Sequence, residues 1–184
     1  MIAIKPGIVK KTTVSVPGSK SYTHRMLIAA ALSNGRCTVD NPLISEDTII
    51  TRKCLTHMGI TISEIHNGLL VHGSGGRLKG SEIPLDLGNS GTSMRLLTAV
   101  AALGRGGVTL TGTRRMRERP IQNLLDGLNQ IGVTARSLND DGCPPVEVIG
   151  GNLKGGKVAL DCRISSQFLS ALLLIAPYAA QTVD

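Results

Sequence analysis

Aromatic residues are almost absent from this sequence. They make up 2% of the 184 residues, namely Phe168, Tyr22 and Tyr178, and there is no tryptophan. A protein that stacks nucleic-acid bases on aromatic rings would have almost nothing to build with. Hydrophobic residues make up 41% of the chain, which is enough for a sizeable core. That core must therefore be aliphatic.

Cysteines and long apolar runs are also scarce. The four cysteines form no CxxC pair, and no histidine stands at metal-ligand spacing, so we expect neither a zinc site nor a redox motif. Residues 1–17 hold no apolar signal core, and the longest apolar stretch, residues 168–180, is interrupted by Ser170 and Pro177. We therefore expect a soluble protein of a reducing cytoplasm, with no membrane partner.

Several nucleotide and hydrolase motifs are missing as well. The chain contains no GxxxxGK[ST], no GxGxxG and no GxSxG, so ATP, dinucleotides and serine-hydrolase chemistry are not supported. The formal net charge of +7 suits an anionic partner. Only the location of that charge can indicate which kind of anion it is.

An internal repeat organises the chain, with an offset of about 70 residues. Residues 14–27 and 85–97 both show a short alternating strand, a Gly/Ser turn and the start of a helix. Each copy then continues with a strand, a second helix and a pair of strands. The expected helices of this kind cover 21–33 and 92–103, and the expected later strands cover 37–41, 61–65, 69–71, 108–111, 134–138 and 146–149.

A third copy begins with an expected strand at 158–161 and a helix at 168–176. The repeat units then cover about 14–72, 84–150 and 157–184, joined by glycine-rich connectors at 73–80 and 150–156. This pattern predicts an α/β fold of repeated βαβαββ units with the third unit incomplete. Its strand-to-helix turns would gather at one end of the molecule.

Each strand-to-helix turn is a candidate anion site, because a helix N-terminus exposes unpaired N–H groups and a partial positive charge. In the first turn Lys20 supplies a mobile cation, and Ser21 and Arg25 share one helical face. The plainer alternative is that Ser21 caps the helix while both cations are solvated. Of the four histidines, only His24 lies in such a motif.

The other two turns are also rich in hydrogen-bonding groups. Residues 88–92 are nearly free of side chains and suit a flat anion, with Thr92 expected as the helix cap and Asn89 as a possible left-handed turn residue. The third turn offers Ser165, Ser166 and Gln167. One of these serines is expected to cap the helix, which leaves the other free for a ligand.

Four arginines lie within residues 114–119. Such a run can clamp a carboxylate or a phosphate, although alone it is more typical of a solvated or nucleic-acid-binding patch. Pro120, expected at the first position of a helix, and Glu118 favour an ordered turn. We interpret Asp47, Glu118 and Asp126 as helix-start charges, so acid–base machinery is scarce.

Four segments together resemble signature segments of one family. They are Val16–Arg25 (VPGSKSYTHR), Leu87–Arg95 (LGNSGTSMR), Arg117–Ile121 (RERPI) and Ser165–Phe168 (SSQF). They resemble the 5-enolpyruvylshikimate-3-phosphate synthases, or 3-phosphoshikimate 1-carboxyvinyltransferases. Members of that family have two domains of three βαβαββ units each, an inside-out α/β barrel. The resemblance implies that residues 17–184 form most of the N-terminal domain, and that residues 1–16 form a strand associating with the C-terminal domain.

The resemblance also implies a reaction. The enolpyruvyl group of phosphoenolpyruvate passes to the 5-hydroxyl of shikimate 3-phosphate, giving 5-enolpyruvylshikimate 3-phosphate and phosphate, a step of aromatic amino-acid biosynthesis that needs no metal and no cofactor. Lys20 would be catalytic and would touch both substrates. Shikimate 3-phosphate would also contact Ser21, Arg25, Ser165, Ser166 and Gln167. Phosphoenolpyruvate would contact Gly91, Arg119 and Gln167, with Asn89 and Thr92 supporting the turn. The base would lie in the C-terminal domain, so we expect the isolated chain to be inactive.

Two alternatives stay open. A related enolpyruvyl transferase that acts on UDP-N-acetylglucosamine shares the fold, but it has Lys-Asn in place of Lys20-Ser21, a reactive cysteine in its arginine loop and no Ser-Ser-Gln. A basic nucleic-acid-binding module would rest on the net charge and the arginine run, and it predicts steep salt dependence of binding. Because the third unit is incomplete, we also expect exposed apolar surface and self-association.

Overall fold

The computed structural model describes residues 3, 7 and 11–184. The first unit has its elements in the order that the repeat predicts. These elements are α1 (Lys20–Leu32), β1 (Arg36–Asp40), α2 (Glu46–His57), β2 (Thr61–Ile65) and β3 (Gly68–His72). The second unit follows the same plan. Its elements are β5 (Leu85–Asp86), α3 (Gly91–Ala101), β6 (Gly104–Thr111), the 3-10 helix η1 (Met116–Glu118), α4 (Gln122–Gln130), β7 (Thr134–Ser137) and β8 (Val146–Gly150).

The two sheets confirm the repeat, because they share one topology. In the first sheet β3 lies between β1 and β2, and in the second β8 lies between β6 and β7, all antiparallel. The second sheet also gains β5 and β4 (Leu78–Lys79), which pair parallel to β6 at its two ends. The expected connector at 73–80 is therefore wrong in part, because it supplies a strand to the next unit.

Two expected strands do not form. Residues 11–19 contain no strand, and Val14 and Val16 are 72% and 75% exposed. Half of the residues of the predicted strand over 1–16 lie outside the described residues, and residues 3, 7 and 11–16 form no strand. Residues 158–161 also form no strand. Ala159 N donates to the side chain of Gln130 on α4 at 2.9 Å, and Val158 N donates to Asp184 O at 2.8 Å, beside one isolated bridge between Gly156 and Val183. The third unit is thus reduced to α5 (Gln167–Ile175) and the 3-10 helix η2 (Ala176–Tyr178).

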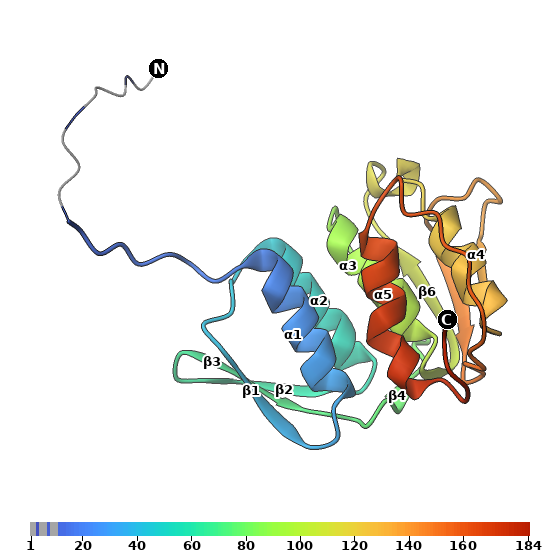
Figure 1. Cartoon of the computed structure of the whole chain (residues 1–184), viewed down its shortest axis with the longest axis horizontal. Helices are drawn as coiled ribbons and strands as arrows, with labels where there is room; N and C mark the ends of the chain where they lie inside the picture. Colours follow the sequence, from blue (N-terminus) through green and yellow to red (C-terminus); the bar gives the residue numbers. More distant parts are fainter. Residues whose placement is uncertain (1–2, 4–6, 8–10) are drawn as a thin grey trace.

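The helices lie inside and the sheets outside. Figure 1 shows α1 and α2 over the first sheet, and α3 and α5 between those helices and the second sheet. The core is aliphatic as predicted, and Phe168 is its one fully buried aromatic ring in the described part of the chain. No helix within the described residues is both long and apolar enough to cross a membrane.

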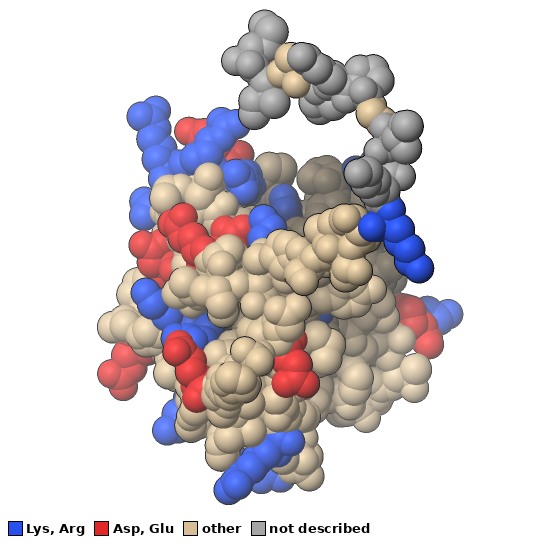
Figure 2. Space-filling model, turned by 90° about the vertical axis from the view of Figure 1, so that its left-hand side faces the viewer, with Lys and Arg blue, Asp and Glu red and all other residues tan. Residues whose placement is uncertain are grey.

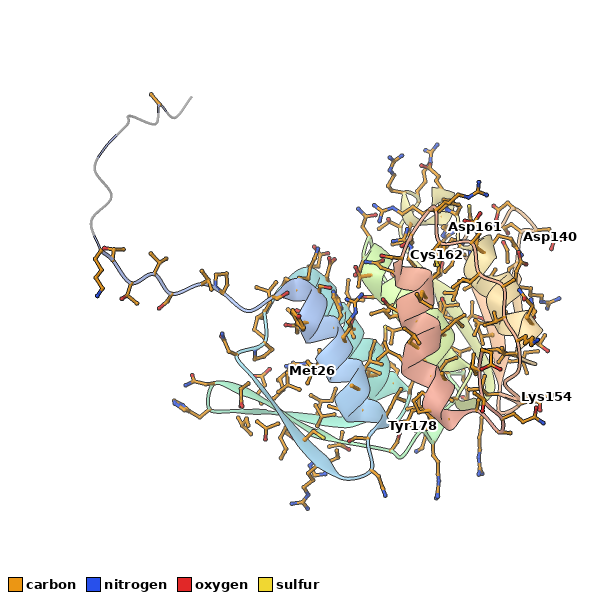
Figure 3. All side chains as sticks on the ribbon, viewed as in Figure 1. Met26, Asp140, Lys154, Asp161, Cys162 and Tyr178 are labelled. Atoms are coloured by element: carbon orange, nitrogen blue, oxygen red, sulfur yellow. The ribbon has the colours of Figure 1, made fainter. Side chains whose placement is uncertain are left out.

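Hydrogen bonds connect the third unit to α1 near both ends of that helix. Near the end of α1, the hydroxyl of Tyr178 donates to the carbonyl oxygen of Leu32 at 2.7 Å (Figure 3). Near its beginning, Arg25 donates to the hydroxyl of Ser170 on α5 at 3.1 Å. These two contacts set α5 beside α1, although the two helices are far apart in the sequence.

Helices α1 and α5 expose apolar side chains to solvent. They are Tyr22, Met26, Leu169 and Leu173, spaced four residues apart on each helix and therefore on one face of it. We expect this surface to drive self-association, because exposed apolar side chains on adjacent helices favour burial against a second molecule. The double variant Met26→Glu, Leu173→Glu should sediment as a monomer at protein concentrations where the parent chain forms larger species.

The control for this experiment is Ile83→Glu, since Ile83 is an exposed apolar residue on a loop away from both helices. It should leave the sedimentation of the parent chain unchanged. A parent chain that is a monodisperse monomer at high concentration would contradict the expectation.

Candidate functional site

The first turn of α1 presents Ser21 and Arg25 together. The helix is capped by Ser19, whose hydroxyl accepts from Tyr22 N, so the alternative in which Ser21 is the cap is wrong. Ser21 lies one turn from Arg25, which donates Nη1 to the hydroxyl and to the carbonyl oxygen of Ser21 and Nη2 to Ser170. Arg25 is thus held in place, and it joins the starts of α1 and α5.

Lys20 forms an ion pair with a residue from the next helix. Its Nζ lies 2.9 Å from Oδ2 of Asp47 in the first turn of α2. Asp47 is a helix-start charge, as predicted. The sequence did not predict its pairing with Lys20, because the two residues are 27 positions apart. The lysine side chain remains 52% exposed. An ion pair this exposed is weak, so the ammonium group is available to a stronger anionic partner.

The second turn differs from its prediction in two details. Ser90, not Thr92, caps α3, because its hydroxyl accepts from Ser93 N. Thr92 instead accepts at Oγ1 from Gln167 Nε2, at 3.1 Å. The left-handed residue is Gly88, with φ 53°, and not Asn89, since glycine adopts this conformation without a steric penalty.

Two guanidinium groups converge on the backbone of Gly91. A Cβ atom at this position would lie 2.9 Å from Nη1 of Arg119 and 3.4 Å from Nη1 of Arg95. Burial, and then the charge of Arg119, lower the pKa of Arg95 below its usual value. Neither arginine forms an ion pair within the described residues. Two like charges at a helix N-terminus form a site that favours an anion.

Arg95 was missed as a site residue in the sequence. Its Nη1 donates to Gln167 Oε1 at 2.9 Å, and its guanidinium carbon lies 5.7 Å from the centre of the Phe168 ring. The repeat contained the signal, because it places Arg95 at the position equivalent to Arg25. In both units this arginine bonds a residue of α5.

The two serines of the third turn differ in their hydrogen bonds. The hydroxyl of Ser165 accepts from Gln167 N at 3.2 Å, which serves the start of α5. Ser166 occupies the cap position without a side-chain cap, and its hydroxyl has no partner among the described residues. One hydroxyl is therefore occupied as an acceptor, and the other is available.

The arginine run forms an ordered turn, as predicted. Arg114 and Arg115 lie 3.7 and 3.2 Å from Glu118, and only Arg119 reaches the second turn, where Nη1 donates to Asn89 O at 3.4 Å. Pro120 is not the first residue of a helix, since α4 begins at Gln122 with Ile121 as its cap, so that expectation is wrong. Figure 2 shows acidic and basic side chains interspersed on the face it presents.

These contacts bring the predicted site residues to one end of the molecule. In Figure 1 the first turns of α1, α3 and α5 lie toward the same end. The groups around Lys20 and Gly91 do not touch directly; they are joined through Asp47, whose carbonyl oxygen accepts from the hydroxyl of Ser93 at 3.3 Å. A cavity of about 790 Å³ lies elsewhere, in the first unit, around Asp40, Arg52 and Glu64.

No group of three His, Cys, Asp or Glu side chains that could hold a metal ion occurs in the part of the chain that the structure describes. The binding groups of the site are instead cations, hydroxyls and amides. These groups suit phosphate and carboxylate ligands.

The family model for EPSP synthase (3-phosphoshikimate 1-carboxyvinyltransferase) matches residues 5–184. The chain belongs to the EPSP synthase family. Among curated relatives, the 3-phosphoshikimate 1-carboxyvinyltransferase of Methanosphaerula palustris is 48% identical over 173 residues, which is 92% of this chain and 41% of that protein. The enzyme of the same name from Methanothermobacter thermautotrophicus is 46% identical, over 90% of this chain and 39% of its own length.

Solved structures agree with the family assignment. EPSP synthase from Acinetobacter baumannii superposes with a TM-score of 0.82 at 32% identity, covering 90% of this chain and 38% of that one. The enolpyruvyl transferase NikO from Streptomyces tendae has a TM-score of 0.61 at 16% identity, which shows the shared enolpyruvyl transferase fold alone. The chain spans about 40% of the length of these EPSP synthase relatives.

His24 is buried beneath this EPSP synthase-like site. Its Nδ1 lies 2.8 Å from Oγ1 of Thr51, and Nε2 has no partner among the described residues. Burial lowers the pKa of His24 from 6.5 to about 4. The negative charge of Asp47 opposes this shift, and the positive charges of Lys20 and Arg25 contribute to it less strongly. The ring is therefore neutral at physiological pH.

This shift predicts a pH-dependent stability. Because the folded pKa lies below the unfolded one, the unfolded chain binds the extra proton, and stability falls as pH drops from about 6.5 towards 4, by about 3 kcal/mol. Urea unfolding across this window should give a steeper loss for the parent chain than for His24→Gln, which cannot titrate. If the free energy of unfolding fell equally with pH in both proteins, the lowered pKa of His24 would be contradicted.

Proposed function

We propose that this chain forms the N-terminal half-site of a 3-phosphoshikimate 1-carboxyvinyltransferase, in which shikimate 3-phosphate and phosphoenolpyruvate bind at the gathered helix starts. The observation that carries the proposal is the convergence of Arg95 and Arg119 on Gly91, beside the amide of Gln167. Two cations without a neutralising carboxylate, at a helix N-terminus, favour a small polyanionic ligand. Phosphoenolpyruvate is such a ligand, because it carries a phosphate and a carboxylate.

The second substrate would lie between α1 and α5. Arg25, Ser21 and Ser166 offer a guanidinium group and two hydroxyls for the phosphate of shikimate 3-phosphate. Ser165 accepts from Gln167 N, but its own O–H can still donate to the ligand. Gln167 is held by Arg95 on its oxygen and by Thr92 on its nitrogen, which leaves one N–H and one lone pair of the amide for the ligands.

Lys20 is the proposed catalytic residue of this half-site. Its ammonium group would leave Asp47 and contact both substrates where the enolpyruvyl group passes to the 5-hydroxyl. We infer that the C-terminal domain of the family supplies the base, so that this chain binds the substrates without turnover.

We also infer that the protein lies in the cytoplasm. This inference is supported by the four cysteines, which are all free, as expected in a reducing compartment.

Calorimetric titration with shikimate 3-phosphate tests the proposal. The parent chain should bind, and Lys20→Ala and Ser166→Ala should each weaken binding by about tenfold or more, because each removes a hydrogen bond to a charged ligand group. Lys154→Ala is the control, since Lys154 lies far from the helix starts (Figure 3) and should leave affinity unchanged. Absence of binding by the folded chain, also after addition of a relative's C-terminal domain, would overturn the proposal.

Gly91→Ala should separate the two substrates. The new methyl group would displace the guanidinium of Arg119, so phosphoenolpyruvate affinity should fall by about tenfold while shikimate 3-phosphate affinity changes little. Gly107→Ala is the matched control, because a Cβ there would meet nothing within 4 Å. Equal losses for both substrates in Gly91→Ala would argue against a phosphoenolpyruvate position at Arg119.

A further inference from the structure

A continuous chain of buried polar atoms runs beneath the site through three helices. His24 Nδ1 on α1 lies 2.8 Å from Thr51 Oγ1 on α2, which lies 2.8 Å from Ser93 Oγ on α3. Ser93 Oγ lies 2.7 Å from the hydroxyl of Ser90, the cap of α3. All four side chains are buried. None of them belongs to the substrate-binding groups named above.

The next layer of the same helices is apolar. One turn further along, the equivalent positions are Ile28 on α1, Leu55 on α2 and Leu97 on α3, all buried in the core. Apolar contacts are non-directional and allow small sliding of helices, whereas hydrogen bonds are limited in distance and angle. Within the described residues, side-chain hydrogen bonds therefore join the three helices only in their first turns, where Lys20 binds Asp47, and in the layer directly below.

Two assignments of protons satisfy every hydroxyl, and they run in opposite directions along the chain. The following one leaves no buried N–H of His24 without an acceptor. His24 Nδ1–H donates to Thr51, Thr51 donates to Ser93, and Ser93 donates to the carbonyl oxygen of Asp47 at 3.3 Å. Ser90 accepts from Ser93 N and donates to Ser93 Oγ. Nε2 then keeps a bare lone pair, which is less costly than an orphaned buried N–H. This places the neutral Nδ1–H tautomer on His24.

The ends of this chain are residues that hold the site. Asp47, which accepts from Ser93 through its carbonyl oxygen, binds Lys20 through its carboxylate. Ser90 immediately precedes Gly91, where the two guanidinium groups converge. His24 lies one helical turn after Lys20 on α1. A shift of any one helix along another would break the chain and separate Lys20 from Gly91.

We propose that His24, Thr51, Ser93 and Ser90 form a positioning chain that fixes the first turns of α1, α2 and α3 relative to one another and so sets the spacing of the two anion-binding groups at Lys20 and Gly91. These are positioning residues that act through Lys20 and Gly91. The inference rests on the proposed function for its ligand, but the placement of the helix starts can be measured without any ligand.

Thr51→Val tests the proposal, because valine keeps the shape of threonine and removes only the hydroxyl. The matched control is Thr98→Val on α3, where an equally buried hydroxyl bonds only Met94 of its own helix, at the carbonyl oxygen and at the sulfur, among the described residues. Both variants lose one buried hydroxyl, so a merely structural role predicts similar effects in both. Ser93→Ala, which adds no volume, replaces Thr51→Val if that variant fails to fold.

The first measurement uses the ligand-free chain and nitrogen NMR. In the parent chain we expect a slowly exchanging proton on His24 Nδ1. In Thr51→Val we expect loss of that signal together with shifted amide resonances at Lys20, Asp47 and Gly91. In Thr98→Val these resonances should stay unchanged, and Thr51→Ser should restore them. Unchanged resonances at Lys20 and Gly91 in Thr51→Val would overturn the positioning role.

The second measurement is calorimetric titration with shikimate 3-phosphate. Thr51→Val should weaken binding about tenfold, Thr98→Val should bind as the parent does, and Thr51→Ser should recover affinity. Equal affinity in Thr51→Val and Thr98→Val would overturn the link to the site. If the parent chain does not bind even after addition of a relative's C-terminal domain, the proposed function fails, and the ligand-free resonances still decide whether the four residues position the helices.

Discussion

Unneutralised positive charge at gathered helix starts is the constraint on which this structure depends. Helices α1, α3 and α5 begin at one end of the molecule, where their unpaired N–H groups add to the charges of Arg25, Arg95 and Arg119, none of which forms an ion pair within the described residues. Like charges repel, so such an arrangement persists only where the surrounding packing holds it. The aliphatic core below, built from two sheets with helices between them, supplies that packing.

The repeat explains how one chain builds several anion-binding turns. In each of the first two units a helix follows a Gly/Ser turn, and three antiparallel strands then pair with the last strand of the unit in the middle. The units then diverge in their charges. Arg25 and Arg95 occupy equivalent positions but bond different partners on α5, namely Ser170 and Gln167. A single supersecondary unit thus yields two chemically different subsites against one shared helix.

Between the charged end and the aliphatic core lies the polar layer of His24, Thr51, Ser93 and Ser90. Buried polar groups are costly unless they are fully hydrogen-bonded, so this layer stabilises one relative placement of the three helices. His24 is neutral in this layer, because a charged ring would place a second N–H, on Nε2, where it has no acceptor among the described residues. Site geometry and core stability are therefore coupled through the same few hydroxyls.

The sequence by itself determined the α/β class, the repeat, the element order and the turns that hold Lys20, Gly91, Arg119 and Ser166. These are local features, because they follow from hydrophobic periodicity, glycine and serine placement, and helix-start chemistry. The sequence alone misplaced the caps at Ser21 and Thr92, because two neighbouring hydroxyls compete for the same N–H groups and only backbone angles decide between them.

Only the tertiary structure decided which distant residues meet. The pairing of Lys20 with Asp47, the contact of Arg95 with Gln167 and the chain from His24 to Ser90 all join separate helices, and no sequence spacing encodes them. The strands expected at 14–16 and 158–161 failed for the same reason, since a strand exists only where a partner strand lies beside it. Local sequence features predict which residues can form helices, turns and sites, and tertiary packing decides which of these residues meet.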